Sequence, residues 1–187
     1  MGDDEIVELF WRRSEIALSE AEHKYSKYCH SIAFGILRNT EDAEECVNAT
    51  LAKAWEAMPP ARPSVLRTFL GKITRNLSLN TLEKMNAVKR GLGQVTLALT
   101  ELEECVSDTV PNVEQLIEEK VITQVVNSFL GLLNTTQRKV FVRRYWYVSS
   151  LEEIADDYDM TVSKVKSILF RLRKKLKTEL EKEGVSL

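Results

Sequence analysis

Apolar residues recur at steps of three and four along most of the 187-residue chain, which is the spacing of amphipathic α-helices. The chain has only seven Gly and four Pro, and three prolines fall in residues 58–64, where they predict a loop. We therefore predict the all-α class. The predicted helices cover residues 25–37, 43–55, 64–84 and 113–130, with a further one beginning near Thr135 or Thr136. We expect Asn39 or Thr40 to cap the second of these helices, and we expect the third to point Phe69, Leu70, Ile73 and Leu77 inward.

A change of composition divides this helical pattern into two parts. Residues 91–112 begin with GLGQ, contain the acidic run ELEEC and include a proline at position 111. Glycine, proline and a charge run between periodic segments indicate a connection between domains. We therefore predict a first domain over residues 1–92, a linker over 93–112 with a short helical piece near 97–102, and a second domain over 113–187.

The last third of the chain has the pattern of two short helices separated by a tight turn. Ser150 and Glu153 have the S-x-x-E spacing of a capping box, and Thr161 can cap the next helix. That second helix has one apolar stripe, formed by Val162, Val165, Leu169, Leu172 and Leu176. The arrangement is typical of a helix-turn-helix whose second helix enters a DNA groove.

The charges of this segment support DNA binding. Residues 160–178 contain seven Lys or Arg and no Asp or Glu. An ordinary amphipathic helix with a solvated basic face is the alternative, but the capped helix before it and the missing acids favour a DNA reader. The predicted base-edge contacts are Ser163, Lys164, Ser167 and Arg171, and the predicted phosphate contacts are Lys166, Arg173, Lys174 and Lys175.

The net charge of the whole chain is only −2, so the positive charge is local rather than global. Acidic residues gather at 41–56, where Lys53 is the only basic residue, and a basic stretch follows from Arg62 to Arg90. An acidic helix beside a basic one suggests one basic partner and one nucleic acid. The alternative is that both are solvated faces, which is the usual role of charge runs.

The remaining composition argues against several classes of protein. No apolar run reaches about 18 residues, so we expect no membrane insertion, and the acidic start lacks the order of a signal peptide. Three widely spaced cysteines indicate the reducing cytoplasm rather than a disulfide framework. The chain has two His and no Gly-rich phosphate loop or nucleophile elbow, so we expect no enzyme, cofactor or metal centre.

Three segments carry a resemblance to bacterial sigma factors. NTEDAEECVNATLAKAW, residues 39–55, looks like their polymerase-binding helix, and FLGKITRNLSLNTLEK, residues 69–84, resembles the helix that meets the minus-ten promoter element. Residues 133–176 are similar to the region that reads the minus-thirty-five element. The order of the segments, the length and the short linker resemble the extracytoplasmic-function (ECF) group of the sigma-70 family.

The resemblance implies a promoter-specificity subunit whose partners are core RNA polymerase, promoter DNA and an anti-sigma factor. The implied polymerase contacts are Asp42, Glu45 and Asn48, and Trp55 is expected in the core. The loop at residues 58–64 would hold an unstacked minus-ten base. Lys72 and Arg75 would contact phosphate, while Asn76 and Asn80 remain either helix caps or base readers.

Some positions depart from the family pattern. Asn80 stands where the family usually has an acid, and Glu83 stands where it often has a base. Ile168 and Phe170 occupy places that are often Arg and His. Three roles stay open for Phe170: contact with a thymine methyl, packing on the polymerase flap, or binding of an inhibitor. A stand-alone helix-turn-helix regulator is the alternative function, but it leaves the N-terminal charge pattern without a role.

Overall fold

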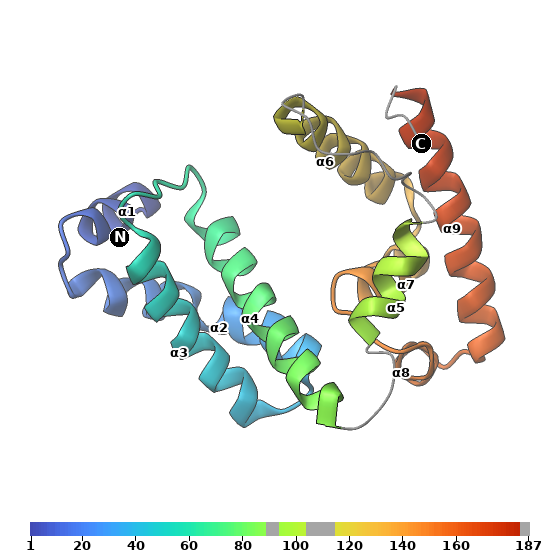
Figure 1. Ribbon diagram of the computed structural model, residues 1–187, viewed down its shortest axis with the longest axis horizontal. Helices are drawn as coiled ribbons and strands as arrows, with labels where there is room; N and C mark the ends of the chain where they lie inside the picture. Colours follow the sequence, from blue (N-terminus) through green and yellow to red (C-terminus); the bar gives the residue numbers. More distant parts are fainter. Residues whose placement is uncertain (89–93, 104–114, 184–187) are drawn as a thin grey trace. The chain divides into compact units, whose positions relative to one another are not determined.

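The computed structural model describes residues 1–88, 94–103 and 115–183. Every regular element in this part of the chain is a helix, which confirms the predicted all-α class (Figure 1). The chain divides into two compact units, Met1–Gly91 and Leu92–Leu187. None of the helices in the described ranges is long and apolar enough to cross a membrane.

The first unit is built from α1 (Asp3–Trp11), α2 (Ile16–Leu37), α3 (Thr40–Ala57) and α4 (Leu66–Val88). The last three helices pack against one another, and α1 packs on α2 and α4. Asn39 caps α3 as predicted, because its side-chain oxygen accepts the backbone N–H of Asp42 at 3.1 Å. Helix α1 was not predicted, although Ile6, Val7 and Phe10 have helical spacing and are buried in the core.

The face of α4 that packs into the first unit differs from the prediction. We expected Phe69, Leu70, Ile73 and Leu77 to point inward, but the fully buried side chains are Leu66, Leu70, Thr74 and Ser78. Thr74 and Ser78 donate to the carbonyls of Leu70 and Thr74, both at 2.8 Å. Hydroxyls that are satisfied within their own helix can be buried without leaving unpaired groups, so the small polar residues occupy the core.

The opposing helix α3 completes a neutral polar seam with these hydroxyls. Thr50 donates to the carbonyl of Cys46 at 2.8 Å and lies 3.1 Å from the hydroxyl of Thr74. The Cys46 thiol lies 3.2 Å from the Ser78 hydroxyl. We call Cys46, Thr50, Thr74 and Ser78 the hydroxyl seam. Cys46 and the other described cysteine, Cys29, are free and buried, and Cys105 lies outside the described residues.

The second unit contains α5 (Gln94–Glu103), α6 (Gln115–Leu132), α7 (Thr135–Tyr145), α8 (Leu151–Asp157) and α9 (Val162–Lys182). Helix α9 packs on α6, α7 and α8, and its stripe of Val165, Leu169, Leu172 and Leu176 is buried. Phe141 lies between Phe129 and Tyr145, with ring centroids 5.4 and 4.6 Å apart in edge-on geometry. The predicted apolar face of α9 is therefore the wall that closes this core.

The segment that we predicted as a linker contributes a helix to the second unit. We expected a short helical piece near residues 97–102, and α5 spans Gln94–Glu103 and packs on α7. Ala98 is buried, and Glu101 binds side chains of the second unit. The other predicted linker positions, 93 and 104–112, lie outside the described residues.

Candidate functional site

Helices α8 and α9 form the predicted helix-turn-helix, and both predicted caps are present. The Ser150 hydroxyl accepts the N–H of Glu153 at 3.1 Å, and the Glu153 carboxylate accepts the N–H of Ser150 at 2.7 Å. The Thr161 hydroxyl accepts the N–H of Lys164 at 3.2 Å. Between the helices, Asp159 adopts a left-handed conformation with φ of 50°. These local bonds fix where α9 begins.

The outer face of α9 carries the predicted DNA contacts of the second unit. All of them except Arg173 are exposed: Ser163, Lys164, Lys166, Ser167, Arg171, Lys174 and Lys175. Side chains that are polar or basic on one face and apolar on the other let the helix bind a duplex while it stays docked on its own domain. Phe170 is also on the exposed surface, with 63% of its area accessible, and Ile168 is half-buried.

Two of these outward side chains are bonded to the backbone of their own helix. The Ser167 hydroxyl donates to the Ser163 carbonyl at 2.9 Å, and Nε of Arg171 donates to the Ser167 carbonyl at 3.1 Å. The Arg171 bond uses Nε, so its two terminal nitrogens keep the fork geometry that matches O6 and N7 of guanine. The face is thus preformed for a bidentate base contact.

Arg173 does not occupy the place that the sequence predicted. We expected it to contact phosphate, but only 17% of its side chain is exposed. Its Nη1 donates to the Tyr145 hydroxyl at 3.0 Å and to a carboxylate oxygen of Glu101 at 3.4 Å. Arg173 is turned inward because the half-buried carboxylate of Glu101 and the buried phenol of Tyr145 satisfy it there.

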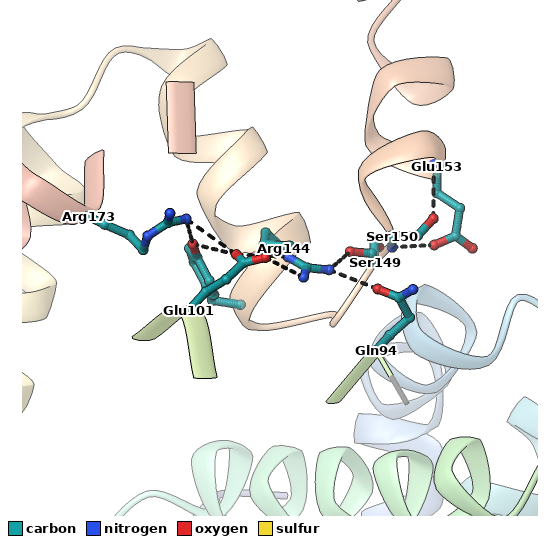
Figure 2. A network of polar contacts seen from close by, with 8 residues as sticks. Gln94, Glu101, Arg144, Ser149, Ser150, Glu153 and Arg173 are labelled. Carbon is teal, nitrogen blue, oxygen red and sulfur yellow. Dashed lines mark hydrogen bonds and ion pairs between the residues drawn. The ribbon is translucent and has the colours of Figure 1, made fainter. Parts of the chain in front are cut away.

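The inward cations belong to a polar network that sequence reasoning missed (Figure 2). Arg144 is 2% exposed and makes a 2.6 Å ion pair with Glu101. It also donates to the Ser149 carbonyl at 2.9 Å and to the Gln94 side chain at 3.0 Å. We call Gln94, Glu101, Arg144, Tyr145 and Arg173 the ionic clip. Its members are up to 79 positions apart in sequence, from Gln94 to Arg173, so no local pattern indicates it.

The ionic clip shifts the protonation of its acid and its phenol. Burial by itself raises the pKa of Glu101, but hydrogen bonds and charge from Arg144, with help from Tyr145 and Arg173, lower it below the ordinary value of 4.5. Burial raises the pKa of the Tyr145 phenol. At neutral pH the clip therefore contains one carboxylate, two guanidinium groups and a neutral phenol.

In the first unit, the predicted polymerase contacts lie on α3. Glu45 and Asn48 are exposed and Asp42 is half-buried. Asn48 lines an open groove of about 550 Å³ between α2 and α3, together with Glu22, Ser26, Lys27, His30, Glu44 and Val47. The groove offers carboxylates and an amide as acceptors, which suits a partner that presents basic side chains.

The predicted minus-ten contacts lie along α4. Lys72, Asn76 and Asn80 are exposed, and Arg75 is half-buried. Burial lowers the pKa of Arg75, which still remains charged because a guanidinium is not deprotonated in proteins. Asn76 and Asn80 lie inside α4 rather than at its ends, so the cap alternative is wrong for both.

Lys72 and Asn76 also line a shallow groove between α3 and α4. The groove has a volume of about 410 Å³, and its other walls are Lys53, Ala57, Phe69, Ile73 and Leu77. Phe69, Ile73 and Leu77 were expected in the core, and their position at the rim explains why they are only half-buried. Apolar walls edged by lysines and an amide suit single-stranded bases and their phosphates.

Helix α1 holds the loop that precedes α4. The indole N–H of Trp11 donates to the Ala61 carbonyl at 3.0 Å. Arg62 makes a 2.9 Å ion pair with Glu8, and its guanidinium lies 5.2 Å from the Trp11 ring centroid. Met58 is fully buried at the start of the loop. The loop at residues 58–64 is therefore anchored by residues of α1 that lie about 50 positions earlier in the sequence.

Trp55 also lies near α1, as part of the packing of the first core. It is partly buried against the core cluster, with its ring centroid 6.1 Å from that of Phe10. The Arg13 guanidinium covers the ring at 5.3 Å. Among the residues that the structure describes, no group of His, Cys, Asp or Glu could hold a metal ion.

Two parts of the chain match known family models. Residues 23–88 match the model for Sigma-70 region 2, and residues 129–178 match the model for Sigma-70, region 4. The first match includes the whole of α3 and α4, and the second includes the whole of α7 and α8 and α9 as far as residue 178. Helices α1 and α5 lie outside both matched regions.

Proposed function

Because this chain belongs to the sigma-70 family of non-catalytic transcription initiation factors, we propose that it is an ECF-group promoter-specificity subunit of bacterial RNA polymerase. The observation that carries the proposal is the order of the two matched regions, each within one compact unit. A stretch of 40 residues, 89–128, separates them. Membership of the sigma-70 family accounts for a role in promoter recognition. The assignment to the ECF group and the roles of single residues are what we propose.

In this proposal α9 reads the minus-thirty-five element in the major groove. Ser163, Lys164, Ser167 and Arg171 meet base edges, while Lys166 and Lys174 contact phosphates and fix the register. The support is their common exposure on one face of α9 and the free fork of Arg171.

The first unit would capture the minus-ten element as a single strand. Lys72 and Arg75 neutralise phosphates, and Asn76 and Asn80 offer amides to bases. The anchored loop at residues 58–64 would hold an unstacked base. The groove between α3 and α4 supports this assignment, because it combines apolar walls with cationic and amide edges.

Docking on core polymerase is assigned to the acidic side of α3. Asp42 and Glu45 would accept basic side chains, and Asn48 would donate and accept at the groove between α2 and α3. This partner places the protein in the cytoplasm. An anti-sigma factor that covers the two DNA-binding surfaces would keep the protein inactive.

Run-off transcription tests the proposal. Core polymerase is combined with the chain on a library of genomic fragments, and we expect new start sites that share two upstream motifs at fixed spacing. Specific duplex binding without initiation would instead support a stand-alone helix-turn-helix regulator. Absence of both activities would reject the proposal and its alternative.

A matched pair of variants tests the docking surface in the same assay. Reversal of Asp42 and Glu45 to Lys should abolish binding to core while helicity stays native. Glu152→Lys, at an exposed acid of α8, serves as the control and should retain core binding. Undiminished polymerase affinity of the double variant would exclude this side of α3 as the contact.

A further inference from the structure

We propose that Glu101 of α5 is a positioning residue for α9, so that promoter reading by the second unit depends on a helix outside both matched regions. The inference rests on the proposed function, because it assigns α9 to the minus-thirty-five element. Its basis is the ionic clip, in which a carboxylate from α5 joins cations from α7 and α9 (Figure 2).

Glu101 uses both carboxylate oxygens. Oε1 accepts a hydrogen bond from Nη2 of Arg144 at 2.6 Å. Oε2 accepts from Nε of Arg144 at 3.2 Å, from the Tyr145 hydroxyl at 3.0 Å and from Nη1 of Arg173 at 3.4 Å. The two bonds from Arg144 form a bidentate pair, which fixes orientation as well as distance. One side chain of α5 therefore bridges α7 and α9, which also pack directly on each other.

Arg144 extends the clip to the beginning of α8. Its Nη1 donates to the Ser149 carbonyl, and Ser149 directly precedes Ser150, the cap of α8 (Figure 2). The same nitrogen donates to Gln94 at the first turn of α5. Both helices of the helix-turn-helix are thus tied to α5, one through Arg173 and the other through the backbone before Ser150.

The clip has a consequence for the charge of the reading face. Arg173 lies between Arg171 and Lys174 in sequence, but its cation is held inward by Glu101 and Tyr145. Loss of the carboxylate charge removes the charged partner in the clip that holds this cation inward. Arg173 could then turn toward the duplex and add a phosphate contact that carries no sequence information. A base-reading helix that shifts by about 1 Å also weakens its base contacts, because such sites need tight positioning.

Glu101→Gln therefore has a signature that simple unfolding lacks. We expect discrimination between the promoter and a duplex with a scrambled minus-thirty-five element to fall about fivefold or more, which is the size of one lost base contact. Relative to wild type, the slope of log affinity against log salt concentration should steepen in Glu101→Gln by about one released counterion. A purely structural defect would lower the active fraction and leave both quantities unchanged.

The measurement uses holoenzyme, which is core polymerase with the full 187-residue chain, on a promoter selected by run-off transcription. Affinity is measured for matched and scrambled duplexes over a range of salt concentrations. Glu181→Gln, at an exposed acid on α9 itself, is the control and should behave as wild type. Glu101→Asp keeps the charge and should restore at least part of the discrimination.

A second variant separates positioning from added charge. Arg173→Met removes the α9 end of the clip without releasing a cation, so discrimination should fall while the salt dependence does not steepen. If wild-type holoenzyme does not distinguish the two duplexes, the proposed function fails. If wild type distinguishes them and Glu101→Gln does so equally well with the same salt dependence, the positioning role of Glu101 is excluded.

Discussion

The two units solve the same packing problem with different chemistry. In the first unit, α3 and α4 meet at the hydroxyl seam, where Thr50, Thr74 and Ser78 each donate to a carbonyl of their own helix. In the second unit, α5, α7 and α9 meet at the ionic clip, where Arg144 of α7 forms an ion pair with Glu101 of α5. The three seam hydroxyls are satisfied within their own helices, whereas the ion pair between Arg144 and Glu101 forms only when α5 packs on α7.

The difference teaches how each unit should respond to loss of a partner. A neutral hydroxyl still donates to a carbonyl of its own helix when its partner on the other helix is removed, so the loss of free energy of unfolding is small. A buried guanidinium that loses its carboxylate is an uncompensated charge in a medium that solvates it poorly. We therefore expect the second unit to be the more sensitive to mutation, pH and salt.

The largest effect is expected from Glu101→Ala. It leaves Arg144, which is 2% exposed, without a carboxylate, and should lower the free energy of unfolding of the second unit by about 3 kcal/mol. Hydrogen exchange followed by mass spectrometry measures both units in one sample. Leu99→Ala, at an exposed position of α5, is the control. Equal protection of α7 and α9 in the Glu101→Ala variant and in wild type would contradict this account of the clip.

A smaller effect is expected from pH, because protonation weakens the clip but keeps its atoms. The folded pKa of Glu101 is below 4.5, so its contribution is complete above that value and is lost as pH falls through the folded pKa. Protection factors in the second unit, which correct for the pH dependence of intrinsic amide exchange, should fall over that acid range. In Glu101→Gln this acid dependence should be reduced, since the titrating group is gone.

The first unit has its own acid-sensitive pair away from the seam. Hydrogen bonds from Lys24 and Tyr25 lower the pKa of Asp3, so acid also weakens the attachment of α1. Asp3→Asn should reduce the pH dependence of the first unit and leave that of the second unchanged. The acid dependence that remains is expected from Glu8, whose pKa is lowered by a hydrogen bond from Arg12 and by Arg62. A pH dependence of the first unit equal to that of wild type would show that Asp3 is not a titrating group that matters for its stability.

A still smaller effect is expected at the hydroxyl seam. Thr74→Val removes a hydroxyl that is fully buried, yet Thr50 keeps its bond to the Cys46 carbonyl. The free energy of unfolding of the first unit should fall by about 1 kcal/mol. Urea denaturation measures it, with Thr68→Val at an exposed position of α4 as the control. A loss as large as that from Glu101→Ala would remove the contrast between neutral and charged contacts.

The smallest effect is expected from an ion pair at the surface. Lys53 and Glu56 are 2.6 Å apart but 58% and 64% exposed. Lys53→Ala should change the free energy of unfolding by less than about 0.5 kcal/mol, because water screens the pair. Urea denaturation at low and high salt checks this value. A cost of several kcal/mol would mean that burial is not what distinguishes the clip.

The features that the sequence predicted well are those that neighbouring residues determine. Asn39, Ser150 and Thr161 each cap a helix within three residues, so their types and spacing sufficed. The apolar stripe of α9 was likewise visible from its period. These signals located the helix-turn-helix and the exposed residues of its outer face.

The features that the sequence did not predict depend on distant partners. The inward turn of Arg173 requires Glu101, 72 positions earlier, and the anchored loop requires Trp11, 50 positions before Ala61. The burial of Thr74 was not predicted, because a reading based on apolar periodicity places residues with hydroxyl groups on the exposed face of a helix. A polar group can be buried when its partner is present, and one sequence does not show which partner that is.

The self-bonded face of α9 has a consequence for how the protein would search DNA. Ser167 and Arg171 already donate to carbonyls of their own helix, so contact with a base is an exchange of partners rather than a new bond. On unrelated DNA these side chains can keep their own carbonyls while lysines hold the phosphates. We expect a nonspecific mode in which the protein slides along the duplex. The specific mode should form only where the contacts with the correct base compensate for the lost bonds to the helix carbonyls.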